Sequence, residues 1–278
     1  MMRSGSFLLI AASLGFLFLY APILSLVVYS FNDSRLVTVW GGFTTKWYGE
    51  VFKDTALVNA ALVSLRVALI AATLATILGT IAGFVLSRFG RFRGRLLFTG
   101  MVTAPLVMPE VITGLSLLLL FVGLEQATGW PAGRSATTIV IAHTTFCLAY
   151  VAVVVQSRLA GFDRSLEEAA MDLGARPLKV FFSVTLPIIA PALISGWLLA
   201  FTLSLDDAVI ASFVSGPGST TLPVEILSRV RRGVSPVINA LATLIIVVVA
   251  AGFLIASLMM IRAERQRRRD EQKALTGK

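Results

Sequence analysis

The sequence predicts an all-α integral membrane protein that crosses the bilayer six times, with both termini in the cytoplasm. Three observations carry this prediction: the composition, the long apolar stretches and the distribution of positive charge. Of the 278 residues, 56% are hydrophobic and 14% are charged, whereas soluble domains carry roughly a quarter charged residues. One cysteine excludes an intramolecular disulfide, and with one histidine there is no Cys/His set for a metal site.

A transmembrane helix needs about 20 apolar residues, each rising about 1.5 Å, to cross a hydrocarbon core of about 30 Å. Six stretches meet this length, at residues 7–30, 57–87, 96–122, 137–156, 192–214 and 237–261. The first is longer than a signal-peptide core and no small-residue cleavage site follows it, so we expect a retained helix. The domains expected are an N-terminal helix with its external segment (1–56), a helical domain (57–261) with a cytoplasmic loop at 157–191, and a basic tail (262–278).

The positive charges give the orientation. If the N-terminus lies inside, sixteen Lys and Arg residues fall in inside segments, seven fall in outside segments, and Arg66 lies within a helix. Cytoplasmic segments of membrane proteins are enriched in Lys and Arg, so both termini are expected in the cytoplasm. The formal net charge of +9 is then explained by topology and by contact with anionic lipid, and no nucleic-acid partner is expected.

Two outside segments are more than short connections. Residues 32–56 carry Trp40, Trp47 and Tyr48, which suit the headgroup level of a bilayer. Residues 222–230 place apolar side chains at helical spacing and predict a short surface helix. These segments could receive a soluble partner from outside, or they could only cap the helices.

Patterns typical of enzymes are missing. There is no GxxxxGK[ST] phosphate loop, no HExxH and no GxSxG, so we expect neither catalysis nor ATP binding in that manner by this chain. His143 and Cys147 share one face of a helix, where interior packing is the simpler interpretation. Gly79 and Gly83 form a small-xxx-small pair that predicts close helix packing.

Four ionisable residues fall within the predicted spans: Arg66, Glu110, Asp206 and Asp207. A charge inside a bilayer is costly and usually marks a pathway or an ion pair. Glu110 and Asp206 both lie 14 residues from the cytoplasmic start of their helix, about 21 Å along the axis. Pro105 and Pro109 are expected to interrupt the helix just before Glu110. We therefore expect the three carboxylates to line a path for a cationic solute. Alternatively, Arg66 neutralises one of them and Asp207 faces a neighbouring subunit.

Residues 165–191 form the longest amphipathic, mixed-charge segment of the chain. Ser165 and Glu168 have the spacing of a capping box, which predicts a helix from about Leu166. Gly174 is expected to end this helix, and Pro177 suits the first turn of a second one. Prolines at 187 and 191 are expected to break the chain before the next membrane helix. The segment is predicted to dock a soluble partner.

The same segment resembles the EAA motif of ABC importer permeases, EAA-x3-G-x9-I-x-LP. The matching residues are Glu168, Ala169, Ala170, Gly174, Leu186 and Pro187, and the only departure is Val184 in place of isoleucine. The resemblance implies a type-I ABC importer permease in the bacterial inner membrane. It also implies that the short helix is a coupling helix, seated in a separate cytoplasmic ATPase, with Glu168 as the polar contact and Gly174 as the turn.

Further likeness covers nearly the whole chain and points to the polyamine branch of this family. It lies in YAPILSLVVYSFN near the start, APLVMPEVITGLSLLLLF around residue 110 and SLDDAVIASFVSGPGSTTLP around residue 210. The resemblance implies putrescine as cargo and a heterodimer with a second permease. The other partners it implies are two copies of the ATPase, which hold ATP and Mg, and a periplasmic polyamine-binding protein. Another small organic solute, an ATPase-independent transporter or channel, and a membrane enzyme are the alternatives.

Overall fold

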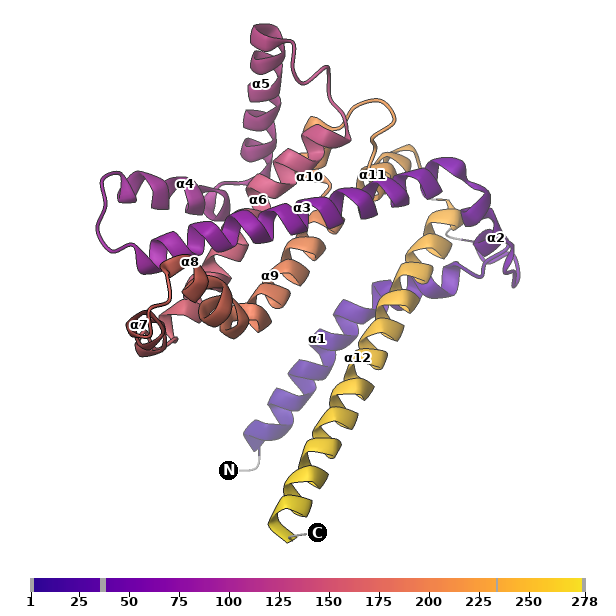
Figure 1. The fold of residues 1–278 in the computed structure, drawn as a ribbon. Helices are drawn as coiled ribbons and strands as arrows, with labels where there is room; N and C mark the ends of the chain where they lie inside the picture. Colours follow the sequence, from indigo (N-terminus) through magenta and orange to yellow (C-terminus); the bar gives the residue numbers. More distant parts are fainter. Residues whose placement is uncertain (1–2, 36–38, 234, 277–278) are drawn as a thin grey trace. The chain divides into compact units, whose positions relative to one another are not determined.

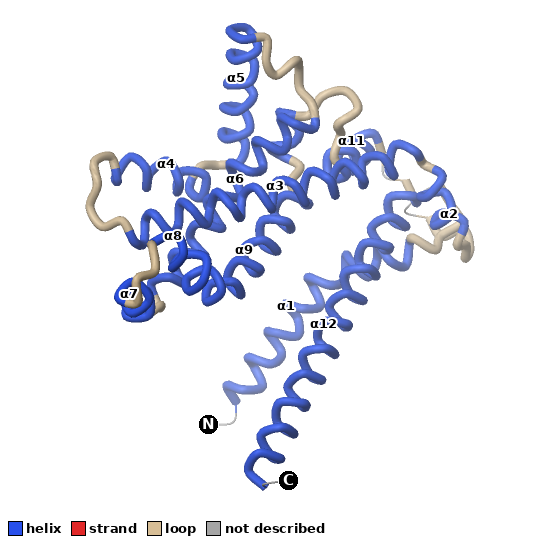
Figure 2. The backbone as a smooth tube through the Cα atoms, in the orientation of Figure 1, coloured by secondary structure: helices blue, strands red, loops and turns tan. Residues whose placement is uncertain are grey.

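A computed structural model describes residues 3–35, 39–233 and 235–276. The named elements of this part are all helices, as the all-α prediction requires (Figures 1 and 2). The chain divides into two compact units, Met1–Thr55 with Arg229–Lys278, and Ala56–Ser228. Each is described by itself.

The first unit is built on two long helices, α1 (Arg3–Tyr29) and α12 (Pro236–Thr276). They pack against each other and run in opposite directions, so that both termini lie at the same end of the pair (Figure 1). A short helix, α2 (Lys46–Lys53), packs against α12. Trp47 of α2 is buried, and its indole Nε1 donates a hydrogen bond to the Asn32 carbonyl at 2.7 Å. Arg229 forms a two-point ion pair with Asp54 at 2.5 and 3.0 Å.

The second unit is organised around the contact between α3 (Thr55–Arg88) and α6 (Ala136–Ala160). A Cβ atom added at Gly79 would lie 2.7 Å from Val151 Cβ, and one added at Gly83 would lie 2.8 Å from the Ala152 carbonyl oxygen. The two helices therefore approach so closely that only glycine fits at both positions, and the close packing predicted from the small-xxx-small pair is confirmed. The core continues from α6 onto α9 (Leu186–Asp206).

The third predicted span, residues 96–122, is two helices. They are α4 (Arg95–Val107) and α5 (Glu110–Thr128), with a break at Met108 and Pro109. Pro105 is accommodated inside α4, whereas Pro109, with ψ of 136°, turns the chain and stands directly before α5. The break expected at Pro109 is thus confirmed, and the interruption expected at Pro105 is wrong, because α4 continues through that residue.

The fifth predicted span, residues 192–214, differs at both ends. Helical structure begins at Pro177 and runs without interruption through α8 (Pro177–Val180), a π-helix η1 (Phe181–Thr185) and α9. The expected chain breaks at Pro187 and Pro191 are therefore wrong. Pro187 directly follows the π-helix and Pro191 lies inside α9. Such prolines are tolerated in membrane helices, where local π adjustments and neighbouring helices satisfy the freed carbonyls. The span ends early, at Asp206, and α10 (Val209–Val214) follows as a separate helix.

Five helices are long and apolar enough to cross a membrane among the described residues: Phe7–Tyr29, Thr55–Arg88, Glu110–Thr128, Ala136–Ala160 and Pro177–Asp206. Two shorter apolar helices are Arg95–Val107 and Pro236–Gly252. The sixth crossing stays a prediction. The predicted short helix at 222–230 is confirmed as α11 (Leu222–Arg232), and its position on the outer surface stays a prediction.

Candidate functional site

The predicted coupling segment contains a short helix, α7 (Ser165–Asp172), set between α6 and α8. It begins differently from the expectation. The Ser165 side chain makes no capping bond and Arg164 occupies the cap position, so the capping box of Ser165 and Glu168 is wrong. Instead the Asp163 carboxylate accepts the Ser165 backbone N–H at 3.0 Å. This hydrogen bond lowers the pKa of Asp163, because it stabilises the ionised carboxylate.

The end of α7 follows the prediction. Gly174 has a φ of +84°, the left-handed conformation that glycine adopts most readily. Its N–H donates to the Met171 carbonyl at 2.8 Å, and the Ala175 N–H donates to the Ala170 carbonyl at 3.1 Å. These two bonds form a Schellman motif, which satisfies the last carbonyls of the helix. Pro177 then opens α8 at its first turn, also as predicted.

One side of α7 is exposed and partly apolar. Leu166, Met171 and Leu173 are exposed, the last to 90%, and Glu168 of the EAA pattern is exposed beside them. A short helix that presents large apolar side chains and one free carboxylate has the make-up of a docking surface for another protein. We call this set of four side chains the docking face.

Glu167, next to this face, points toward α3 and the π-helix and lines one cavity with Glu168 and Met171. Its carboxylate forms an ion pair with Arg88, the last residue of α3, with Oε2 3.0 Å from Nε. Its other oxygen, Oε1, accepts a hydrogen bond from Thr185 Oγ1 at 2.7 Å. The sequence analysis missed this cluster, because no spacing pattern joins residues that are 79 and 18 positions apart along the chain.

The predicted pathway carboxylates differ in exposure, because two are exposed and one is buried. Glu110 is exposed at the start of α5, and Asp206 is exposed at the end of α9. Gly114, one turn after Glu110, packs against α10, since a Cβ there would lie 2.7 Å from Phe213 Cδ2 and 3.3 Å from Ile210 Cα. The α4–α5 break and the α9–α10 break therefore flank one helix contact, and both leave an acidic side chain exposed.

Asp207, in contrast, is buried and fully engaged within the chain. Its Oδ2 lies 3.1 Å from His143 Nε2 and also accepts the Ala211 N–H at 2.8 Å. The other ring nitrogen of His143 lies 2.7 Å from Ser204 Oγ. Asp207 thus joins α6 to the turn between α9 and α10. His143 and Cys147 are both buried, which confirms their interpretation as interior residues.

Arg66 forms no ion pair with any of the three carboxylates within the part of the chain described, although a counter-ion role was expected. It is exposed and lines a cavity of about 400 Å³ together with Asn59, Thr220 and Glu225. Among the described residues, no three His, Cys, Asp or Glu side chains gather in a way that could hold a metal ion.

Known proteins resemble this chain along most of its length. A family model described as "Binding-protein-dependent transport system inner membrane component" matches residues 75–269. The putrescine transport system permease protein PotI of Escherichia coli (strain K12) is 65% identical over 264 residues, covering 95% of this chain and 94% of the relative. The spermidine/putrescine permease protein PotC of the same organism is 42% identical over 229 residues, covering 82% and 84%.

The fold has a counterpart among solved structures. A subunit of a bacterial ABC transporter that imports the polysaccharide alginate matches with a TM-score of 0.67 at 18% identity, covering 92% of this chain and 98% of that one. At this identity the match speaks for the fold alone. The family model spans more than half of the chain, and the two relatives extend the likeness to nearly all of it. This protein therefore belongs to the family of binding-protein-dependent transport system inner membrane components.

Proposed function

We propose that the chain is one permease of a heterodimer that imports a polyamine, putrescine, with energy from ATP hydrolysed by a separate subunit. The observation that carries the proposal is the 65% identity to the putrescine permease over 95% of this chain. The next relative is named for spermidine as well as putrescine, so the cargo class is common to both. The partners are a second permease, two ATPase copies holding ATP and Mg, and a periplasmic polyamine-binding protein.

The proposed topology has six crossings with both termini in the cytoplasm. It is supported by the excess of Lys and Arg on one side, and by α1 and α12 ending together at their free ends. With this orientation α7 lies in the cytoplasm, between the crossings formed by α6 and by α8 to α9. The proposed domain boundaries lie at 56 and 261, and the proposed coupling loop, 157–191, includes the start of the helix that runs from Pro177 to Asp206.

The docking face of α7 is proposed to seat in a cleft of the ATPase subunit. The exposed Glu168 would make the polar contact, flanked by Leu166, Met171 and Leu173. Ala169 and Ala170 allow a close approach because they are small, and Gly174 redirects the chain after one short helix. Leu186 and Pro187 begin α9, so a displacement of α7 would reach a membrane helix within about 15 residues.

The cargo is proposed to pass Glu110 and Asp206. Both carboxylates are exposed at helix breaks that flank one contact, and a diamine carries a positive charge at each end. Asp207 is buried among contacts within the chain, so we assign it a supporting role at the edge of this path. The path is a weak and transient site, since a high affinity would trap the cargo.

Uptake of labelled putrescine by cells that carry the full transporter tests this function. Uptake should require this chain, stop when the ATPase is inactivated, and fall when unlabelled putrescine or spermidine competes. The alternative is an importer of another organic solute, and it predicts that polyamines fail to compete. Uptake that persists without the ATPase would instead support a self-sufficient transporter.

A further inference from the structure

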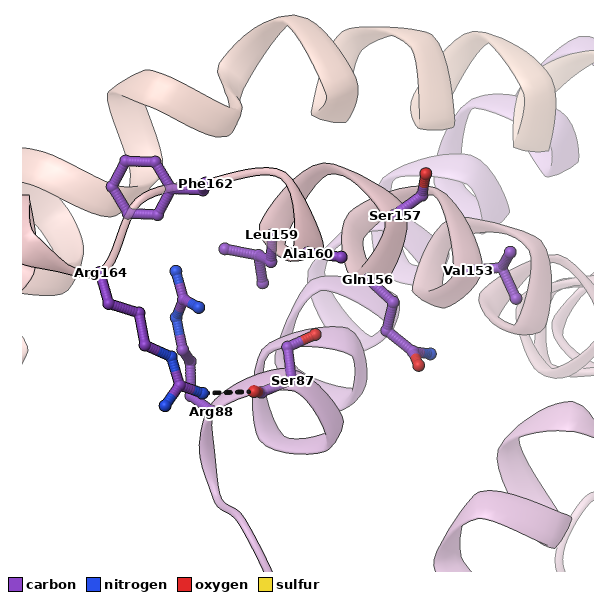
Figure 3. A pocket seen from close by; sticks show the side chains of 9 residues that line it. All are labelled: Ser87, Arg88, Val153, Gln156, Ser157, Leu159, Ala160, Phe162 and Arg164. Atoms are coloured by element: carbon purple, nitrogen blue, oxygen red, sulfur yellow. Dashed lines mark hydrogen bonds between the residues drawn. The ribbon is translucent and has the colours of Figure 1, made fainter.

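The contact between α7 and the membrane helices is unusual, because little apolar packing holds it. No residue of α7 is fully buried, and its large apolar side chains are exposed. Cavities lie on both sides of Arg88. One, of about 610 Å³, is lined by Ser87, Arg88, Phe162 and Arg164 among others (Figure 3). The second, of about 230 Å³, is lined by Arg88, Glu167 and Thr185, with Glu168 and Met171 also at its wall. The attachment of α7 therefore depends on polar contacts.

Those polar contacts converge on Glu167. The side chains of Arg88 and Glu167 are only 11% and 13% exposed, and Thr185 is buried. Arg88 ends α3, and Thr185 ends the π-helix that leads into α9. The guanidinium of Arg88 also stacks over the Phe162 ring at 5.3 Å. The Glu167 carboxylate of α7 thus contacts both α3 and the π-helix that leads into α9.

A second contact ties the chain just before α7 to the same end of α3. Arg164 Nη2 donates a hydrogen bond to the Ser87 carbonyl at 3.0 Å, drawn as the dashed line in Figure 3. Arg88 Nε and Nη2 are both buried with no hydrogen-bond partner among the described atoms, so the contact of Nε with Glu167 is an ion pair without hydrogen-bond geometry. Glu167 is the ion-pair partner of this guanidinium within the described part of the chain, and a buried charge that loses its partner is strongly unfavourable.

We propose that Glu167, with Arg88 and Thr185, forms the joint through which a movement of α7 is passed to α3 and to α9. The three are positioning residues for the coupling of ATP hydrolysis to transport. This inference rests on the proposed function. The joint connects α7 to two elements. The ion pair of Glu167 with Arg88 connects α7 to α3, and the hydrogen bond of Glu167 with Thr185 connects α7 to the π-helix, an element often found at functional sites.

Glu167 and Glu168 are adjacent carboxylates on one helix with different surroundings. Both line the cavity beside Arg88, but Glu167 contacts Arg88 and Thr185, whereas Glu168 is exposed and belongs to the docking face. The pair gives a matched test, because the same small change at each position should produce different defects. Glu167→Gln should spare the ATPase contact and weaken transmission, and Glu168→Gln should weaken the ATPase contact itself.

The experiment uses the complete complex, with its partner permease, ATPase and putrescine-loaded binding protein, reconstituted in lipid vesicles. The measured quantities are the amount of ATPase that stays bound and the putrescine taken up per ATP hydrolysed. For Glu167→Gln we expect bound ATPase to be unchanged and uptake per ATP to fall about tenfold, the factor that about 1.4 kcal/mol corresponds to. Arg88→Gln should have the same effect as Glu167→Gln on both quantities. The double variant Arg88→Glu with Glu167→Arg, which exchanges the two charges, should recover part of the lost uptake per ATP. Arg91→Gln, in the exposed loop after α3, should change neither quantity.

An unchanged uptake per ATP in Glu167→Gln would overturn the proposal, and so would loss of the ATPase from that variant, since Glu167 would then be a docking residue. If the charge variants fail to assemble, Thr185→Val decides, because it removes one hydroxyl at nearly constant volume. It should lower uptake per ATP two- to fivefold, and no change would overturn the joint. A failure of the proposed function would look different. The ATP hydrolysis rate of the unaltered complex would be the same with and without putrescine-loaded binding protein, and the Glu168→Gln complex would retain as much bound ATPase as the unaltered one.

Discussion

The contact of Gly79 and Gly83 with α6 gives a prediction whose size can be worked out from the structure. In Gly79→Ala the added methyl group would lie 2.7 Å from Val151 Cβ and 2.9 Å from the Leu148 carbonyl oxygen. Overpacking of this kind costs about 1–3 kcal/mol. Alanine recovers about 0.5–1 kcal/mol because it is the better helix former. The free energy of unfolding should therefore fall by about 1.3 kcal/mol at mid-range and by about 2.5 kcal/mol at most. The mid-range value is roughly a ninefold drop in the ratio of folded to unfolded protein.

Gly123→Ala in α5 is the matched control. A Cβ atom at this position meets nothing within 4 Å, so only the gain in helix propensity applies and the stability should hold or rise slightly. The assay can use Cys147, the single cysteine of the chain, which is buried in α6. Its labelling by a maleimide during a temperature ramp reports the unfolding of the second unit. If the Gly79→Ala transition did not fall below that of Gly123→Ala, the close approach of α3 and α6 would be refuted.

Three further predictions concern the site. Asp207→Ala should lower the free energy of unfolding by about 3–5 kcal/mol, because it leaves His143 and two backbone N–H groups of α10 without their partner. Maleimide labelling of Cys147 measures this loss. An unchanged unfolding transition would contradict the structural role of Asp207. Asp206→Asn and Glu110→Gln should each lower the initial rate of putrescine uptake about tenfold, since one charge-assisted contact with the cargo is lost. The amount of bound ATPase should stay constant. Unchanged uptake rates would show that neither carboxylate lies on the path of the cargo. Gly174→Ala forces an L-residue to a φ of +84° at a cost of about 1–2 kcal/mol. The variant complex should therefore retain less bound ATPase. The same amount of bound ATPase as in the wild type would show that the turn tolerates a side chain.

Local signals predicted the local features well. The glycine pair in α3, the Gly174 turn, Pro177 at the start of α8 and the break at Pro109 each follow from the conformational preferences of one or two residues, and the structure has all four. The features at Gly174, Pro177 and Pro109 depend on backbone freedom and on missing N–H groups, whereas the glycine pair depends on the missing side chains that let α6 approach α3.

The errors arose where a neighbouring group or a tertiary contact outweighs the pattern. Prolines 187 and 191 are typical helix breakers, yet both lie within helical structure that continues from Pro177 to Asp206. Ser165 had the spacing of a cap, but Arg164 occupies the cap position and the Asp163 carboxylate accepts the Ser165 N–H. Asp207 resembled its neighbour Asp206 in sequence, and only the position of His143, 64 residues away, separates a buried partner from an exposed carboxylate.

We propose that this chain couples ATP hydrolysis by another subunit to the entry of a polyamine. The ATP hydrolysis rate of the reconstituted transporter, measured with loaded and with unloaded binding protein, tests this coupling. Putrescine-loaded binding protein should raise the rate well above the basal level, and the unloaded protein should leave it low. An assembled complex whose hydrolysis rate is the same with both would contradict the claim.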